Sequence, residues 1–302
     1  MLGTISRNLG GIATFATLTV NTVVWCTPLL LFAVLKLVVP ATSFRRVMTR
    51  LIMAIGENWV SCNAVILGLH RSGQMDVRGI EDLHREGWYL VIANHQTWVD
   101  IVVLQVALNR RIPLLKFFLK QELIWFPILG IAWWAMDFPF MKRYSKSYLA
   151  RHPGKKGRDL EATRMACRKF REAPTSVFNF IEGTRFTQEK KISIQSTYEH
   201  LLPPKAGGIA LALTSMGDMF DSILDVTLVY PHGVAHFWDL CCGDFEGIII
   251  DVNKRAVENW MVEGDYENDR EFRSRFHRWL AGIWHEKDDR IAYTMSSHPA
   301  GG

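Results

Sequence analysis

The sequence predicts an α/β fold, a mixed sheet flanked by helices, preceded by an N-terminal membrane-associated helical hairpin. Three observations lead to this prediction: a stretch of 28 uncharged residues near the N-terminus, several short apolar runs typical of buried strands, and helical stretches between those runs. Strands that alternate with helices are typical of α/β domains. With 302 residues, 49% of them hydrophobic, the chain is long enough to bury a large core.

The composition excludes several classes of protein. The aromatic content of 12% is too high for a disordered chain, and five cysteines are too few for a disulfide scaffold. A polytopic transporter is excluded because a single segment is long and apolar enough to cross a bilayer. The cysteines form no C-x-x-C pair and there is no H-E-x-x-H motif, so we expect reduced thiols, no metal and no cofactor.

The uncharged segment Asn8–Leu35 is longer than the roughly 20 apolar residues that a membrane-crossing helix requires. Lys36 and arginines at positions 45, 46 and 50 follow it, against the single Arg7 before it, which favours a cytosolic location for its C-terminal side. A cleaved signal peptide would have a shorter apolar region and a small-residue cleavage site. A buried core helix is the other alternative, and we predict a membrane anchor.

A second helix is predicted over Met48–Leu69. It is less apolar and amphipathic, so the pair forms either a hairpin that dips into one leaflet or a true span, and the sequence leaves both open. We divide the chain into a membrane-anchoring segment (1–72), an α/β domain (73–295) and a disordered tail (296–302).

Four apolar runs in the second segment are bounded by turn residues and predicted as strands: Trp88–Ala93, Ser176–Ile181, Val226–Tyr230 and Gly247–Val252. The predicted helices are Ile101–Leu108, Asp159–Glu172, Gly207–Met216 and Asp269–His285. Asn268 and Glu271 resemble a capping box at the start of the last helix.

Two segments are unusual in composition. Leu123–Met136 has no charge and three tryptophans, and forms either a buried helix pair or a surface for acyl chains and lipid. Lys142–Arg171 carries eleven lysines and arginines against two acidic residues. It is either a solvated helix face or a site that attracts anionic headgroups. Nucleic acid is not an expected partner, because no zinc-finger or RNA-recognition motif is present.

The first candidate site, Asn94–Asp100, follows the first predicted strand. A helix that starts near Thr97 would place His95 in the turn and let Asp100 fold back toward it. A histidine held by a carboxylate is the unit that removes a proton from a hydroxyl group. No G-x-S-x-G motif supplies a serine nucleophile, so we expect a substrate hydroxyl to be the nucleophile in a direct transfer.

The second candidate site is Glu182-Gly183-Thr184-Arg185, which follows the second predicted strand. Gly183 allows a tight turn, and Arg185 offers a bidentate grip on phosphate. Glu182 either orients Arg185 or accepts a hydrogen bond from a substrate hydroxyl. A simple turn with a surface ion pair is the alternative.

Together, N-H-x4-D and the F-x-E-G-T-R that follows about 85 residues later resemble the glycerolipid acyltransferase family, of the 1-acylglycerol-3-phosphate (lysophosphatidic acid) acyltransferase type. The resemblance covers Trp88–Tyr230 and includes the blocks Lys116–Gly130, Asp137–Arg143 and Leu201–Gly208. The family's later Val-Pro motif is missing, because Thr227 stands where the proline is expected.

The resemblance implies transfer of a fatty acyl group from an acyl-CoA or acyl-carrier-protein thioester to the sn-2 hydroxyl of 1-acylglycerol-3-phosphate, which gives phosphatidic acid. It implies His95 as the general base, oriented by Asp100. The residues expected to bind the acceptor are Glu182, Gly183, Thr184, Arg185, Lys205, Arg143 and Lys116. Backbone N–H groups near Thr97 are candidates for stabilising the oxyanion.

The remaining alternatives are another lysophospholipid or glycerol 3-phosphate as acceptor, and a non-catalytic basic protein that binds membrane surfaces. The expected partners are the thioester donor, the lysophospholipid acceptor and an anionic membrane. The expected location is a membrane with the active site facing the cytoplasm. The extended motif FIEGTRFTQEK resembles a branch shared by some bacterial and organellar members, and the bacterial inner membrane is the expected compartment.

Overall fold

A computed structural model describes the chain except for residues 1, 142–150, 152–169, 171–172, 267 and 299–302. Its centre is a six-stranded sheet with strand order β1-β8-β7-β2-β6-β3. The strands are β1 (Met75–Arg78), β2 (Tyr89–Ala93), β3 (Leu115–Phe117), β6 (Ser176–Phe180), β7 (Ser222–Val229) and β8 (Ile248–Arg255). Neighbouring strands are parallel except for the antiparallel pair β7–β8, which confirms the predicted mixed sheet.

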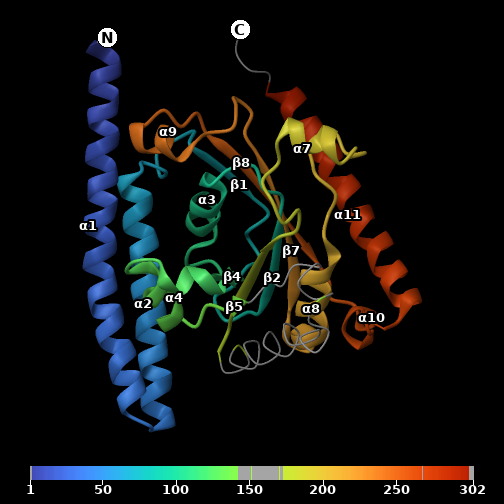
Figure 1. The fold of residues 1–302 in the computed structure, drawn as a ribbon, viewed down its shortest axis with the longest axis horizontal. Helices are drawn as coiled ribbons and strands as arrows, with labels where there is room; N and C mark the ends of the chain where they lie inside the picture. Colours follow the sequence, from blue (N-terminus) through green and yellow to red (C-terminus); the bar gives the residue numbers. More distant parts are fainter. Residues whose placement is uncertain (1, 142–150, 152–169, 171–172, 267, 299–302) are drawn as a thin grey trace.

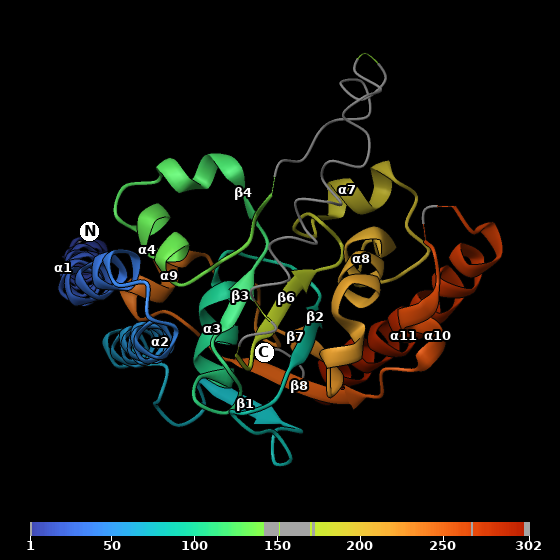
Figure 2. The same cartoon turned by 90° about the horizontal axis from the view of Figure 1, so that it is seen from below.

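The central strand β2 is buried on both faces, as expected for a parallel strand covered by helices. Its odd-numbered residues pack with helix α3 (Val99–Leu108) and α9 (Phe237–Cys242). Leu90 and Ile92 point the other way and pack with α8 (Ala206–Met216) and α11 (Arg270–Ser297). The sheet therefore separates two cores, as Figures 1 and 2 show.

The N-terminal hairpin consists of α1 (Leu2–Val38) and α2 (Thr42–Ile66), which lie side by side along one flank of the molecule (Figures 1 and 2). The second helix starts six residues earlier than predicted, directly after Ala41. Among the described residues, 3–38 form the one helix that is long and apolar enough to cross a bilayer, and only 17% of its most apolar window is buried.

Polar contacts hold α1 against the rest of the protein along its whole length. Near its start, Arg7 pairs with Asp239 at 2.8 Å. In the middle, the Asn21 side chain donates to Asn63 of α2 at 2.8 Å. Near its end, Lys36 pairs with Asp137 at 2.8 Å.

The segment 119–141 forms a small layer beside α1. It contains β4 (Leu119–Lys120), the 3-10 helix η1 (Gln121–Trp125), α4 (Leu129–Ala135) and β5 (Phe140–Met141), with β4 and β5 paired in a second, two-stranded sheet. Of the two alternatives for Leu123–Met136, burial applies to part of the segment. One face of α4 is buried against α1 and α2, whereas several large apolar side chains on the other face are exposed.

Strands β7 and β8 are longer than predicted. The start of β7 was not predicted because Asp225 is polar. Asp225 is nevertheless buried, in an ion-pair cluster with Arg255 (3.0 Å) and Lys287 (2.7 Å). Thr227 lies in the middle of β7 and accepts a hydrogen bond from Lys287 at 3.2 Å. A proline at this position would remove a backbone donor from a strand that is paired on both sides.

The C-terminal helix α11 differs from the prediction at both ends. The predicted capping box at Asn268 is wrong, since Asp269 caps the helix by accepting from the N–H groups of Glu271 (2.8 Å) and Phe272 (3.0 Å). The helix continues to Ser297, two residues into the predicted tail. Most of the predicted helix Asp159–Glu172 and of the basic segment Lys142–Arg171 lies outside the described residues. The remaining short elements are α7 (Gln188–Ser193), η4 (Gly217–Met219) and α10 (Asn259–Glu263).

Candidate active site

The candidate residues gather where three neighbouring strands end. His95 follows β2, Glu182 follows β6 and Tyr230 follows β7. Because β2 pairs in parallel with both β6 and β7, these three ends meet at one edge of the sheet. This edge is the usual place for ligand sites in open α/β sheets.

His95 and Asp100 are in direct contact, with the His95 Nδ1 2.8 Å from the Asp100 Oδ2. A carboxylate only accepts hydrogen bonds, so Nδ1 carries the hydrogen and Nε2 carries the free lone pair. The His95 ring stacks on Phe180 with its centroid at 3.8 Å and an interplanar angle of 12°. The ring is therefore fixed in position and tautomer, while 13% of the side chain stays exposed.

Asp100 is fully buried, and both of its carboxylate oxygens accept hydrogen bonds. The N–H groups of Gln96 and Thr97 donate to Oδ2 at 2.6 and 2.9 Å. The Tyr230 hydroxyl donates to Oδ1 at 2.6 Å. Burial, together with the nearby Asp100, raises the pKa of Tyr230 well above its ordinary value of 10, so the hydroxyl stays protonated and remains a donor.

The turn before α3 differs in detail from the prediction. The helix begins at Val99, two residues after Thr97; the Thr97 hydroxyl accepts from the Val99 N–H at 3.4 Å and donates to the Ala235 carbonyl at 2.7 Å. The amides of Gln96 and Thr97 are bonded to Asp100 and so are not the free donors that an oxyanion would need. Asp100 thus satisfies the amides of Gln96 and Thr97, and the Thr97 hydroxyl satisfies the amide of Val99.

Glu182 is buried, and both of its carboxylate oxygens are occupied. Oε1 accepts from the His95 N–H at 2.7 Å, and Oε2 accepts from the Leu202 N–H at 2.9 Å. Burial raises the pKa of Glu182 to about 7, against the opposing effect of these two hydrogen bonds. Within the described part of the chain no contact joins it to Arg185, so the predicted role of orienting Arg185 is not seen. The two hydrogen bonds instead connect the His95 turn to the loop before α8.

The rest of the second motif lies at the surface beside this tie. Gly183 has φ +68°, a conformation that favours glycine. The Thr184 hydroxyl accepts from the Lys190 ammonium at 2.7 Å. Arg185 is exposed, and its guanidinium lies 5.1 Å from the ring centroid of Trp98, a cation–π contact next to the His95 turn.

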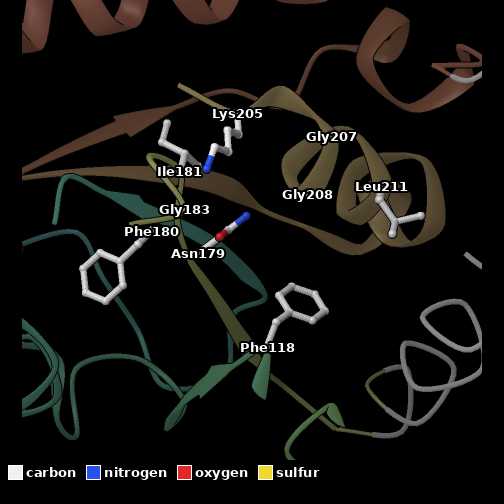
Figure 3. Close-up of a pocket in the computed structure, with 9 residues that line it drawn as sticks. All are labelled: Phe118, Asn179, Phe180, Ile181, Gly183, Lys205, Gly207, Gly208 and Leu211. Carbon is white, nitrogen blue, oxygen red and sulfur yellow. The ribbon is translucent and has the colours of Figure 1, made fainter. Parts of the chain in front are cut away.

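A cavity of about 270 Å³ opens next to this cluster (Figure 3). It is lined by Phe118, Asn179, Phe180, Ile181, Gly183, Lys205, Gly207, Gly208 and Leu211. Phe180 forms one wall and carries the His95 ring on its face. The side-chain nitrogens of Asn179 and Lys205 point into the same space near the start of α8 (Figure 3). The cavity thus combines an apolar wall with a cation and an amide.

One predicted acceptor-binding residue, Lys116, does not line the cavity. Lys116 is on β3, two strands from β2, where it is buried with its ammonium 5.0 Å above the Phe170 ring. Phe118 on the same segment does line the cavity. Arg143 lies outside the described residues.

Sequence reasoning missed Tyr230, which was visible only as the end of a predicted strand. Phe180 was part of the F-x-E-G-T-R motif, but its stacking on His95 was not predicted. Asn94 is also fully buried and exchanges two hydrogen bonds with Leu228, at 2.9 and 2.8 Å, which fastens the His95 turn to β7. The available signal was a polar or aromatic side chain directly at the end of each strand.

Comparisons with known proteins agree with this geometry. The sequence model of the Acyltransferase family matches residues 74–233. Human 1-acyl-sn-glycerol-3-phosphate acyltransferase delta is 28% identical over 152 residues, which cover 46% of this chain and 37% of that protein. The mouse epsilon protein of the same name is 26% identical over 222 residues, which cover 66% of this chain and 54% of that protein. The chain thus spans between about a third and a half of the length of these relatives.

Comparison with solved structures supports the same fold. The crystal structure of the 1-acyl-sn-glycerophosphate (LPA) acyltransferase, PlsC, from Thermotoga maritima matches with a TM-score of 0.54 and 16% sequence identity, covering 94% of this chain and 97% of that chain. At this identity the match establishes the architecture, including the N-terminal helices and the mixed sheet.

Proposed function

The chain belongs to the acyltransferase family, and from this premise we propose that it transfers a fatty acyl group from a thioester donor, acyl-CoA or acyl-carrier protein, to the sn-2 hydroxyl of 1-acylglycerol-3-phosphate. The observation that carries the proposal is the His95–Asp100 pair. The His95 ring is held by the hydrogen bond to Asp100 and by stacking on Phe180, and it lies next to a cavity that has an apolar wall and a lysine. The names of the relatives, 1-acyl-sn-glycerol-3-phosphate acyltransferase delta and epsilon, support this acceptor.

In the proposed reaction His95 is the general base. Its Nε2 takes the proton of the acceptor hydroxyl while the oxygen attacks the thioester carbonyl. The carbon–sulfur bond then breaks, the acyl ester forms, and the proton passes from His95 to the departing thiolate. Asp100 holds the tautomer and stabilises the imidazolium that forms in between.

The acceptor phosphate binds at the cationic side of the cavity. Lys205 supplies a positive charge there, next to the amide of Asn179 and the first turn of α8. Arg185 lies at the surface beside Gly183 and can close on the phosphate from outside. Glu182 contributes by fixing the backbone of His95.

We also propose that α1 rests in one leaflet rather than crossing the membrane. Its three polar tethers, at Arg7, Asn21 and Lys36, bind one side of the helix to the rest of the protein from end to end. Its other side is apolar and exposed over the same length. The active site would then face the cytoplasm, in a bacterial cell at the inner membrane.

The mechanism is tested by comparing His95→Ala with the matched control His70→Ala, which changes an exposed histidine outside the site. The purified proteins receive radiolabelled 1-acylglycerol-3-phosphate and acyl-CoA in detergent micelles. We expect kcat to fall about 10²–10⁴-fold for His95→Ala and to stay unchanged for the control. Substantial turnover by a folded His95→Ala protein would refute the proposed base.

The acceptor is tested with a panel of lysophosphatidic acid, lysophosphatidylcholine, monoacylglycerol and glycerol 3-phosphate, each with one acyl donor. We expect the highest kcat/KM for lysophosphatidic acid. A preference for another acceptor would replace the proposed substrate and leave the acyl-transfer mechanism standing.

A further inference from the structure

An exposed aromatic patch on η1 and α4 has no part in the chemistry proposed above. It consists of Trp125, Phe126, Ile128, Ile131 and Trp134, which are 85%, 51%, 41%, 51% and 43% exposed. An apolar cluster of this size on a protein surface usually marks an interaction site. No charged residue occurs between residues 123 and 136.

The patch stands on a rigid base. The opposite face of α4 is buried through Ala132 and Ala135, in the same core as residues of α1 and α2. Gly130 packs so closely on η1 that a Cβ atom there would lie 2.2 Å from the Ile124 carbonyl oxygen. Ile128 has φ +63°, an uncommon conformation for a β-branched residue. The local fold therefore presents these side chains to the outside in a fixed arrangement.

The patch continues the exposed apolar side of α1. Helix α4 packs directly on α1, as the shared core and Figures 1 and 2 show. The C-terminal half of α1 exposes Leu31, Val34 and Val38. The Lys36–Asp137 ion pair of 2.8 Å fixes the end of α4 to the same part of α1. One surface of the molecule is therefore apolar across two separate elements.

We propose that the aromatic patch is a second membrane contact, seated in the headgroup region of the leaflet that holds α1. Tryptophan suits this role because its ring is apolar and its N–H reaches the polar interface. A lipid surface fits better than a protein partner because the patch continues a helix face that is itself long, apolar and exposed. The inference rests on the membrane location given under the proposed function, and it adds a contact that does not depend on the hairpin alone.

The test is a depth measurement on the full-length chain bound to vesicles of phosphatidylcholine and phosphatidylglycerol. The five native cysteines are replaced by alanine, and single labelling sites are made by Trp125→Cys, Leu9→Cys and Tyr293→Cys. Leu9 lies on the exposed side of α1, whereas Tyr293 is 74% exposed on α11, at the side of the molecule away from α1 (Figures 1 and 2). Each cysteine carries the fluorophore NBD, and brominated phosphatidylcholine serves as the quencher.

We expect quenching and a blue shift at positions 125 and 9, and neither at 293. Quenching at position 9 without quenching at 125 would overturn the second contact and leave the hairpin anchor intact. No quenching at either position would overturn the membrane location as well. Acyl transfer by the same labelled proteins in detergent micelles is measured separately, so a failure of the proposed function is seen independently of the membrane contact.

A second measurement uses no label. The pair Trp125→Ala and Trp134→Ala in the full chain should lower the vesicle partition coefficient about tenfold or more, since each exposed indole loses a large apolar surface that lipid would cover. The matched control Tyr293→Ala should not change it. An unchanged partition coefficient for the double variant, with its fold intact by circular dichroism, would overturn the proposal.

Discussion

The buried Glu182 carboxyl makes the stability of the protein depend on pH in a specific direction. Its ordinary pKa is 4.5, and burial raises the pKa in the folded protein to about 7. Between these two values the folded state binds more protons than the unfolded state. Linkage then requires the free energy of unfolding to fall as the pH rises through this window.

The size of the effect follows from the same two values. A tenfold change in proton affinity corresponds to about 1.4 kcal/mol, so Glu182 should contribute a loss of about 2.5 kcal/mol between pH 5 and pH 8. Glu182→Gln does not titrate and should lack this dependence. Separately from this pH dependence, the variant's free energy of unfolding should be lower by a constant amount of about 1–3 kcal/mol. The reason is that its NH₂ group faces one of the two amides, of His95 and Leu202, that the carboxylate oxygens satisfy.

The assay is urea unfolding of both proteins in detergent micelles, followed by tryptophan fluorescence at several pH values from 5 to 8. The quantity to compare is the difference between the two free energies of unfolding, because other titrating groups are common to both proteins and cancel. We expect this difference to decline with pH. A difference that is constant or rises with pH would refute the claim that burial sets the state of Glu182.

Three further substitutions test the cluster around the site. Tyr230→Phe removes the donor 2.6 Å from Asp100, so it should lower kcat and cost about 1.5–3 kcal/mol of stability; unchanged values in steady-state kinetics and thermal unfolding would contradict this. Lys287→Met leaves the buried Asp225 with one cationic partner fewer and should cost about 3–5 kcal/mol in denaturant unfolding. The double variant with Asp225→Asn should recover part of that loss. Arg185→Ala should raise KM for the phosphate-bearing acceptor about tenfold, as expected for a lost charged hydrogen bond, and leave KM for acyl-CoA unchanged; equal effects on both substrates would exclude a role specific to the phosphate.

The sequence was most informative where the interactions are local. His95 and Asp100 are five residues apart, so a strand end followed by a helix start already places them close together. The strands β2 and β6 were visible as short apolar runs bounded by turn residues, and the mixed sheet followed from their alternation with helices.

Interactions between distant segments were not predictable in this way. The contact of Tyr230 with Asp100 depends on β7 lying next to β2, and the two oxygens of Glu182 reach amides 87 residues earlier and 20 residues later in the chain. Similarly, the start of β7 was missed because Asp225 is buried with cations from β8 and α11 rather than exposed. Such pairings require the strand order, which apolar periodicity alone does not supply.

The central position of β2 has a consequence for biosynthesis. Both of its neighbours are distant in the chain: Tyr89 pairs with Ser176 on one side and with Ser222 on the other. A ribosome must therefore complete more than two thirds of the polypeptide before the middle of the sheet can close, and contacts between such distant segments form slowly. Until then the nascent chain exposes an unpaired apolar strand, which is prone to aggregation. Early adsorption of α1 and α2 to a lipid surface would keep neighbouring nascent chains apart during this interval.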